Sequence, residues 1–155
     1  MKYTRLTKEQ FEELHTEFIN FLASQTIDKN EWDTIKKEKP EVAEQELDVF
    51  SDLIWEGVLS RAQYLEHYSK NHIFLFKCNE HNNESIVIHC HAKHADFLSQ
   101  EGLQWLNENI FTEEVDVRRG SKAFGEDRNG EIFNLITQGA FLSEGELYKQ
   151  FEDMF

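Results

Sequence analysis

The chain has 155 residues, with 30 Asp and Glu against 16 Lys and Arg, and a formal net charge of −14. This excess of negative charge argues against binding to nucleic-acid backbones or anionic lipid surfaces, because both require clusters of Lys and Arg. Hydrophobic residues make up 39% of the chain, enough for a buried core. No signal peptide or membrane span is recognisable, so we expect a cytoplasmic protein with two reduced thiols.

Capping patterns predict two helical segments in the first forty residues. Thr7 and Gln10 have the spacing of a capping box, and apolar residues follow at helical spacing over residues 11–22. Asp28 has the pattern of a second cap. The second helix should end before Pro40, because the residue preceding a proline disfavours the helical conformation.

Pro40 suits the first turn of a third helix, and the segment from there to Ser60 contains six carboxylates and no Lys or Arg. Four carboxylates recur every fourth residue and would lie along one side of the helix: Glu44, Asp48, Asp52 and Glu56. Like charges at this spacing cost about 0.2–0.5 kcal/mol per pair. The stripe is therefore either a solvated helix face or a surface for a cationic partner. Ser60 is expected to cap a further short helix reaching Tyr68.

The second half of the chain changes to β-forming residues. Residues 72–78 and 85–91 flank Asn82 and Asn83, which predicts a β-hairpin turning at these asparagines. Patterns further along the chain predict a helix over 96–109, a short third strand over 115–118, a helix that Asp127 precedes and that ends at Gly139, and a last helix capped by Ser143.

These elements predict an α+β fold. We expect a single domain over residues 1–155, with a helical half over 1–70 and a half containing the hairpin, strand and helices over 71–155. The N-terminal helical layer should pack on a small antiparallel sheet.

Three segments carry a resemblance to a known family: LTKEQFEELHTEFINFLASQ, KKEKPEVAEQELDVFSDLIWEGVL and NHIFLFKC. Together they resemble a family of small acidic proteins of Bacteroidota-type bacteria that is known only as a domain of unknown function. The resemblance implies a bacterial cytosolic protein. It implies no activity, cofactor or catalytic residue.

The hairpin region contains the one candidate metal site. His89 and His91 would point to the same face of a strand, and His94 in the following loop could join them. Three imidazoles, with Cys78 placed diagonally on the partner strand, would be suitable ligands for zinc. The spacing differs from established zinc patterns, so no cofactor is expected and zinc is the alternative.

Two further groups of residues contain side chains that could take part in chemistry. Cys90 alternates with His89 and His91, which places it on the apolar face as a core thiol rather than a nucleophile. Arg118, Arg119, Lys122 and Arg128 form the one basic cluster, which could hold a phosphate or carboxylate or simply offset nearby acidic residues. No catalytic motif is recognisable, so enzymatic activity is not the favoured interpretation.

The favoured hypothesis is a non-enzymatic module that binds an unknown protein partner through the acidic helix. The partner-binding residues would be Glu41, Glu44, Asp48, Asp52 and Glu56. One alternative is a metal-binding site or metal-dependent enzyme at the hairpin. Another is a DNA-mimicking or immunity-type inhibitor, in which carboxylates imitate phosphates.

Overall fold

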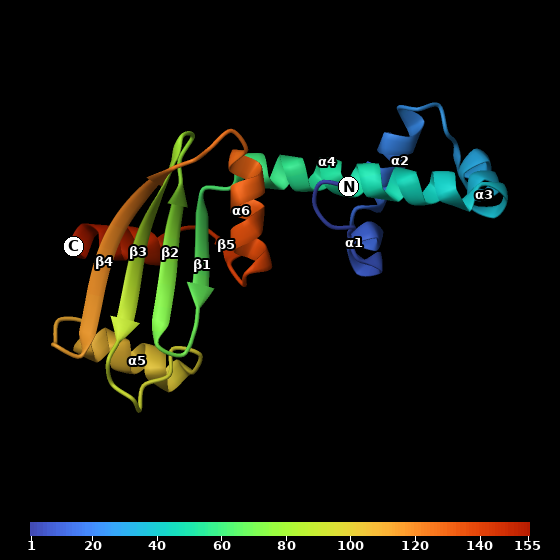
Figure 1. The fold of residues 1–155 in the computed structure, drawn as a ribbon. Helices are drawn as coiled ribbons and strands as arrows, with labels where there is room; N and C mark the ends of the chain where they lie inside the picture. Colours follow the sequence, from blue (N-terminus) through green and yellow to red (C-terminus); the bar gives the residue numbers. More distant parts are fainter. The chain divides into compact units, whose positions relative to one another are not determined.

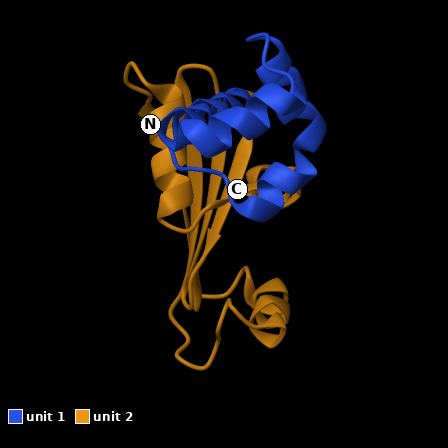
Figure 2. Ribbon diagram, turned by 90° about the vertical axis from the view of Figure 1, so that its right-hand side faces the viewer, with its two compact units in different colours: residues 1–60 blue, residues 61–155 orange.

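The computed structural model describes all residues from Met1 to Phe155. It contains seven helices and five strands, which confirms the α+β class. The chain divides into two compact units, residues 1–60 and residues 61–155 (Figure 2). Each unit is described by itself.

Unit 1–60 is helical throughout. Its helices are α1 (Lys8–Glu13), α2 (His15–Ala23), α3 (Lys29–Glu38) and α4 (Pro40–Arg61), the last of which runs one residue beyond the unit. Thr7 and Gln10 form the expected capping box, and Asp28 accepts a hydrogen bond from the Glu31 amide at the start of α3. Local capping therefore sets these helix starts as the sequence predicted.

Aromatic rings form the interior of this unit. Phe18 of α2 is central: its ring centroid lies 5.0 Å from Phe50 of α4, 5.4 Å from Trp32 of α3 and 5.8 Å from Phe11 of α1. The side chain of Phe50 is 1% exposed. Edge-on and tilted ring contacts of this kind add to the burial of apolar area. Through this cluster, α1, α2 and α3 pack together with one side of α4.

Unit 61–155 is built on a five-stranded antiparallel sheet with the order β4-β3-β2-β1-β5 (Figure 1). The strands are β1 (Tyr64–Tyr68), β2 (His72–Cys78), β3 (Asn82–Cys90), β4 (Val115–Ala123) and β5 (Phe141–Ser143). The helices are α5 (Gln100–Asn109), α6 (Arg128–Thr137) and α7 (Glu146–Met154).

The two faces of this sheet differ in their covering. Ile73, Leu75, Ile86 and Ile88 on one face are fully buried and pack with Tyr148 and Phe151 of α7. Leu106 of α5 joins the same cluster. The other face carries half-buried side chains such as Phe74, Phe76 and His89, and α6 lies beside part of it. Alternation along the strands assigns side chains to these faces.

Two elements differ from the sequence prediction around β1. Residues 64–68 form a strand instead of the expected helix, because they pair with β2 on one side and with β5 on the other. These long-range pairings outweigh the local helix signal at Ser60. The helical part consequently ends near residue 60 rather than 70, and β5 itself was not predicted.

The turn of the hairpin also differs from the prediction. Asn82 already lies in β3, and the turn is closed by a hydrogen bond from the Asn79 amide to the Asn82 carbonyl. His89 therefore pairs with His72 and Cys78 with Asn83, so Cys78 does not lie diagonally across from His89 as the sequence analysis expected. The start of α7 differs as well. Its N-cap is Gly145, with a φ of 80°, whereas Ser143, the predicted cap, is the last residue of β5. Shifts of a few residues at turns change which side chains face one another.

Candidate functional site

The acidic stripe of α4 is contacted by the first residues of the chain. The backbone amides of Lys2 and Tyr3 donate hydrogen bonds to the two carboxylate oxygens of Asp52, at 2.7 and 3.0 Å. One turn along, Glu56 accepts a hydrogen bond from the Tyr3 hydroxyl and lies 3.5 Å from Lys2 Nζ. This segment therefore binds the C-terminal half of the stripe.

Arg5 binds the other half of the stripe. Its Nε donates to Oδ1 of Asp48 at 2.7 Å, and its Nη1 forms an ion pair with Glu44. Hydrogen bonds to these two carboxylates raise the pKa of Arg5. The next residue, Leu6, is buried, and its amide donates to Oγ of the buried Ser51 at 3.0 Å. Residues 2–6 thus form an N-terminal segment fixed along α4.

These contacts show that the carboxylate stripe binds a segment of its own chain. Lys2 and Arg5 offset part of its charge, so the charge repulsion inferred from the helix alone is relieved within the chain. Glu41, the fifth predicted binding residue, is exposed and makes no hydrogen bond or ion pair. The sequence signal for this arrangement was two basic residues near the start of the chain, but nothing local connected them to α4.

A second side of α4 exposes apolar residues. Val49 and Leu53 are 56% and 57% exposed and lie four residues apart, so their side chains are neighbours on one face of the helix. Glu46 and Glu56 lie three residues before and after this pair. We call Val49 and Leu53 with these two carboxylates the α4 seam. The core of this unit contacts α4 around Phe50 instead, which leaves this apolar pair outside the core.

The histidines of the predicted metal site lie in two environments. The ring of His89 stacks on His72 at 4.3 Å and meets the ring of His91 at 4.4 Å. His94 instead packs edge-on against Trp105 at 5.7 Å. No three His, Cys, Asp or Glu side chains are grouped so that they could hold a metal ion. Desolvation, with the neighbouring imidazoles adding to it, lowers the pKa of His89.

Both cysteines are buried and lie on opposite faces of the sheet. Cys90 is 3% exposed in the core, as its alternation with the histidines predicted. Burial raises the pKa of Cys90 and raises that of Cys78 to about 11. Thiols with raised pKa values carry little thiolate near neutral pH, so neither is poised as a nucleophile.

The basic cluster is divided by the fold. Arg118 pairs with Asp116 on the same strand, through Nε and Oδ2 at 3.2 Å. Arg128 donates hydrogen bonds to the backbone carbonyls of residues 62, 78 and 79, so it joins α6 to the segment before β1 and to the end of β2. Lys122 forms no ion pair and lines a hollow beside α6. The structure therefore does not gather these cations into one anion site.

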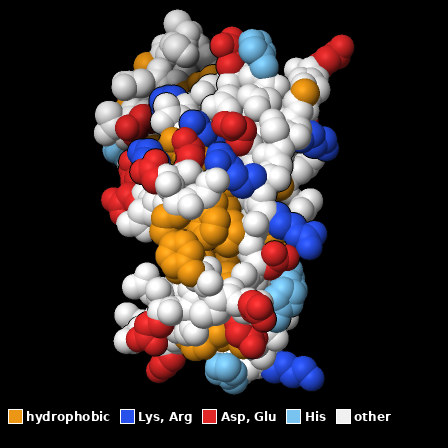
Figure 3. Space-filling view, turned by 90° about the vertical axis from the view of Figure 1, so that its left-hand side faces the viewer, with side chains coloured by type: hydrophobic (Ala, Val, Ile, Leu, Met, Phe, Trp, Pro, Cys, Tyr) orange, Lys and Arg blue, Asp and Glu red, His pale blue; other side chains and the backbone are white.

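Unit 61–155 also exposes apolar side chains. Phe111, which follows α5, is 75% exposed, and its ring lies 5.8 Å from that of Phe155 at the end of α7. An adjoining groove of about 650 Å³ runs between α5 and α7. The face seen from the β4 side shows hydrophobic side chains gathered in one patch (Figure 3). Exposed aromatic residues of this kind are common at protein interfaces.

Comparison with known proteins gives one match. A family of unknown function, DUF6495, matches residues 1–155. The chain belongs to this family. No curated protein and no solved structure matches it. DUF6495 brings no activity to this chain. None of the helices of this DUF6495 chain is both long and apolar enough to cross a membrane.

Proposed function

We propose that this DUF6495 chain is a non-enzymatic, cytoplasmic protein-interaction module of a Bacteroidota-type bacterium, and that α4 binds its protein partner. The observation that carries the proposal is the α4 seam, where Val49 and Leu53 are exposed beside carboxylates. Exposed apolar side chains that are flanked by negative charges favour a partner of complementary shape and positive charge.

The chemistry of the partner follows from the charges around the seam. Residues 1–60 carry 14 Asp and Glu against 7 Lys and Arg. Glu41 makes no interaction within the chain, and Glu46 contacts only the neutral amide of Gln25, at 2.8 Å. A segment with two or three apolar residues flanked by Lys or Arg would fit this surface. We commit to such a cationic amphipathic segment of another protein as the occupant.

The N-terminal segment supports this choice of partner. Within the chain, the carboxylates of α4 already bind Arg5 and the backbone amides of Lys2 and Tyr3, which supports a basic, extended stretch of chain as the partner. A partner would use the carboxylates that this segment leaves available, together with the apolar pair. Glu44, Asp48 and Asp52 would then act indirectly, because they hold the N-terminal segment beside the seam.

The experiment is recovery of the partner from a lysate of the source cell by tagged protein, followed by measurement of binding to the purified partner. Val49→Ser with Leu53→Ser should abolish recovery, and Glu41→Lys should weaken it. Ile19→Ser is the matched apolar control, since Ile19 is exposed on α2, and Glu12→Lys is the matched charge control on α1. Neither control should change recovery.

Three outcomes would contradict the proposal. Recovery that survives the double substitution would show that the seam is not the docking surface. Loss of partner recovery in Phe111→Ser alone would show that the partner binds to unit 61–155 instead. Recovery of a basic DNA-binding protein that duplex DNA displaces would support the alternative of DNA mimicry.

The zinc alternative stays a prediction. His89 and His91 are adjacent, but His94 would have to leave Trp105 to join them. Elemental analysis of untagged protein for zinc, iron and manganese tests it. One equivalent of metal that is lost in His89→Gln would support the alternative.

A further inference from the structure

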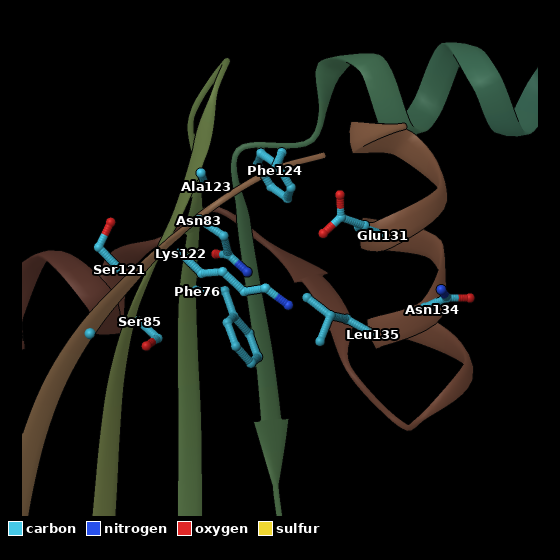
Figure 4. Close-up of a pocket in the computed structure, with 11 residues that line it drawn as sticks. Phe76, Asn83, Ser85, Ser121, Lys122, Ala123, Phe124, Glu131, Asn134 and Leu135 are labelled. Atoms are coloured by element: carbon cyan, nitrogen blue, oxygen red, sulfur yellow. The ribbon is translucent and has the colours of Figure 1, made fainter. Parts of the chain in front are cut away.

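A hollow of about 510 Å³ lies on the half-covered face of the sheet in unit 61–155. Figure 4 shows it between the strands, which form its floor, and α6, which forms one wall. Its volume is in the range of small-molecule sites, about 300–1,000 Å³. All of its lining residues belong to this one unit.

The lining combines an apolar surface with polar side chains from the sheet and from α6. Phe76 on β2, Phe124 after β4 and Leu135 on α6 provide the apolar surface. Gly120 on β4 keeps the floor open, since a Cβ there would lie 3.2 Å from Ser85 Oγ. An apolar cavity with a small number of convergent polar groups is the usual form of a ligand site.

Three polar groups on the sheet side have no partner within the protein. Asn83 Oδ1 is buried without a hydrogen bond. The Ser85 hydroxyl forms no hydrogen bond, and Lys122, which extends across the hollow toward α6, forms no ion pair. A buried acceptor without a partner is unfavourable by itself, so it points to a donor supplied by a ligand.

The opposite wall carries a negative charge. Glu131 on α6 accepts a hydrogen bond from the Gly125 amide through Oε2 at 2.7 Å, which leaves Oε1 available. The hollow therefore has an ammonium group on β4 and a carboxylate on α6. This pairing disfavours a dianion such as phosphate, because Glu131 would repel it, and it suits a ligand with one charge of each sign.

We propose that this hollow binds a free α-amino acid with an aromatic or branched apolar side chain. The ligand carboxylate accepts hydrogen bonds from Lys122 and Ser85. Its ammonium group donates to Glu131 Oε1 and to Asn83 Oδ1, and its side chain packs among Phe76, Phe124 and Leu135. Each of the three unpaired polar groups on the sheet side receives a partner in this arrangement.

Calorimetry with four probes tests the assignment: L-phenylalanine, L-leucine, 3-phenylpropionate, which lacks the ammonium group, and phenethylamine, which lacks the carboxylate. L-Phenylalanine should bind, and each truncated probe should bind at least about tenfold more weakly, as expected when a charged hydrogen-bonding group is removed. Lys122→Gln should weaken the binding of L-phenylalanine to a similar extent and leave the affinity for phenethylamine unchanged. Lys93→Gln, in an exposed loop, is the matched control.

Gly120→Val gives a second test that does not rely on charge. The substitution fills the floor, and valine is favoured over glycine in a strand, so folding should be retained and is checked by thermal melting. It should abolish binding of every probe. Absence of L-phenylalanine and L-leucine binding at about 10 mM would overturn the proposal, because that concentration detects even weak sites. Equal affinity for L-phenylalanine and 3-phenylpropionate, or binding unchanged in Gly120→Val, would also overturn it. None of these results bears on the α4 seam.

Discussion

Arg5 donates a hydrogen bond from Nε to Oδ1 of Asp48 at 2.7 Å, across 43 residues of sequence. This pair shows how the acidic stripe of α4 is used inside the molecule. The stripe holds the N-terminal segment in place, and the adjacent Val49 and Leu53 remain exposed. The proposed docking surface therefore depends on two distant parts of the chain.

The buried end of the N-terminal segment should matter more for stability than its charged part. Ser51→Ala leaves the Leu6 amide without an acceptor in a buried position and should cost about 1–3 kcal/mol. Arg5→Ala removes two partly exposed ion pairs, with Glu44 and Asp48, each of which should contribute about 0.2–1 kcal/mol at most. Urea unfolding followed by Trp32 and Trp55 fluorescence, in a Trp105→Phe background, measures both. Thr16→Ala on α2 is the control, and a larger effect for Arg5→Ala would contradict the ranking.

Gly145 should not tolerate a side chain. Its φ is 80°, and a Cβ would lie 2.4 Å from the ring of Tyr64. This ring extends from β1 and packs against the ring of Tyr148 on α7, so it cannot move away freely. Gly145→Ala should therefore lower the free energy of unfolding by more than about 1 kcal/mol. Gly125→Ala is the matched control, because the nearest atom to its Cβ would be 3.4 Å away. Equal thermal midpoints for the two variants would show that the α7 cap is not constrained.

His89 should titrate below its ordinary pKa of 6.5. Desolvation favours the neutral imidazole, and His72 and His91 add to the effect. The folded pKa is lowered, so the associated stability is present above pH 6.5 and is lost as pH falls through the folded pKa. NMR titration of the His89 ring measures the shift. His72→Gln should reverse it in part, and a pKa at or above 6.5 in the unsubstituted protein would contradict the structure.

The buried thiols should react with a disulfide reagent only after unfolding. Burial raises the pKa of Cys78 from 9.0 to about 11, so it carries little thiolate at pH 8. The stability linked to this thiol is present below pH 9 and is lost between pH 9 and pH 11, because the unfolded chain ionises first. Thiol counting in native buffer and in urea checks the prediction, with exposed Thr16→Cys as the reactive control. Rapid labelling of the native protein would count against the observed burial.

Local signals predicted much of the fold. Thr7, Asp28 and Asp127 cap the helices that the sequence assigned to them, because a cap involves residues only two or three positions apart. The alternation of Cys90 with its neighbouring histidines also predicted its burial correctly. These features depend on periodicity, which can be read without knowing what packs where.

Features that depend on distant partners were missed. Residues 64–68 form a strand because β2 and β5 pair with them, and no local pattern reveals that pairing. The contact of Arg5 with α4 is of the same kind. The hollow beside α6 depends on Asn83, Lys122 and Glu131, which come from three separate elements, so no local pattern indicated it beyond the basic cluster on β4.

The most direct test of the α4 docking surface is hydrogen exchange of the protein alone and with its recovered partner. The partner should slow exchange of backbone amides over residues 42–56, around Val49 and Leu53. Residues 2–6 should keep their protection, because the N-terminal segment stays in place beside the bound partner. Protection confined to residues 61–155 would contradict the account.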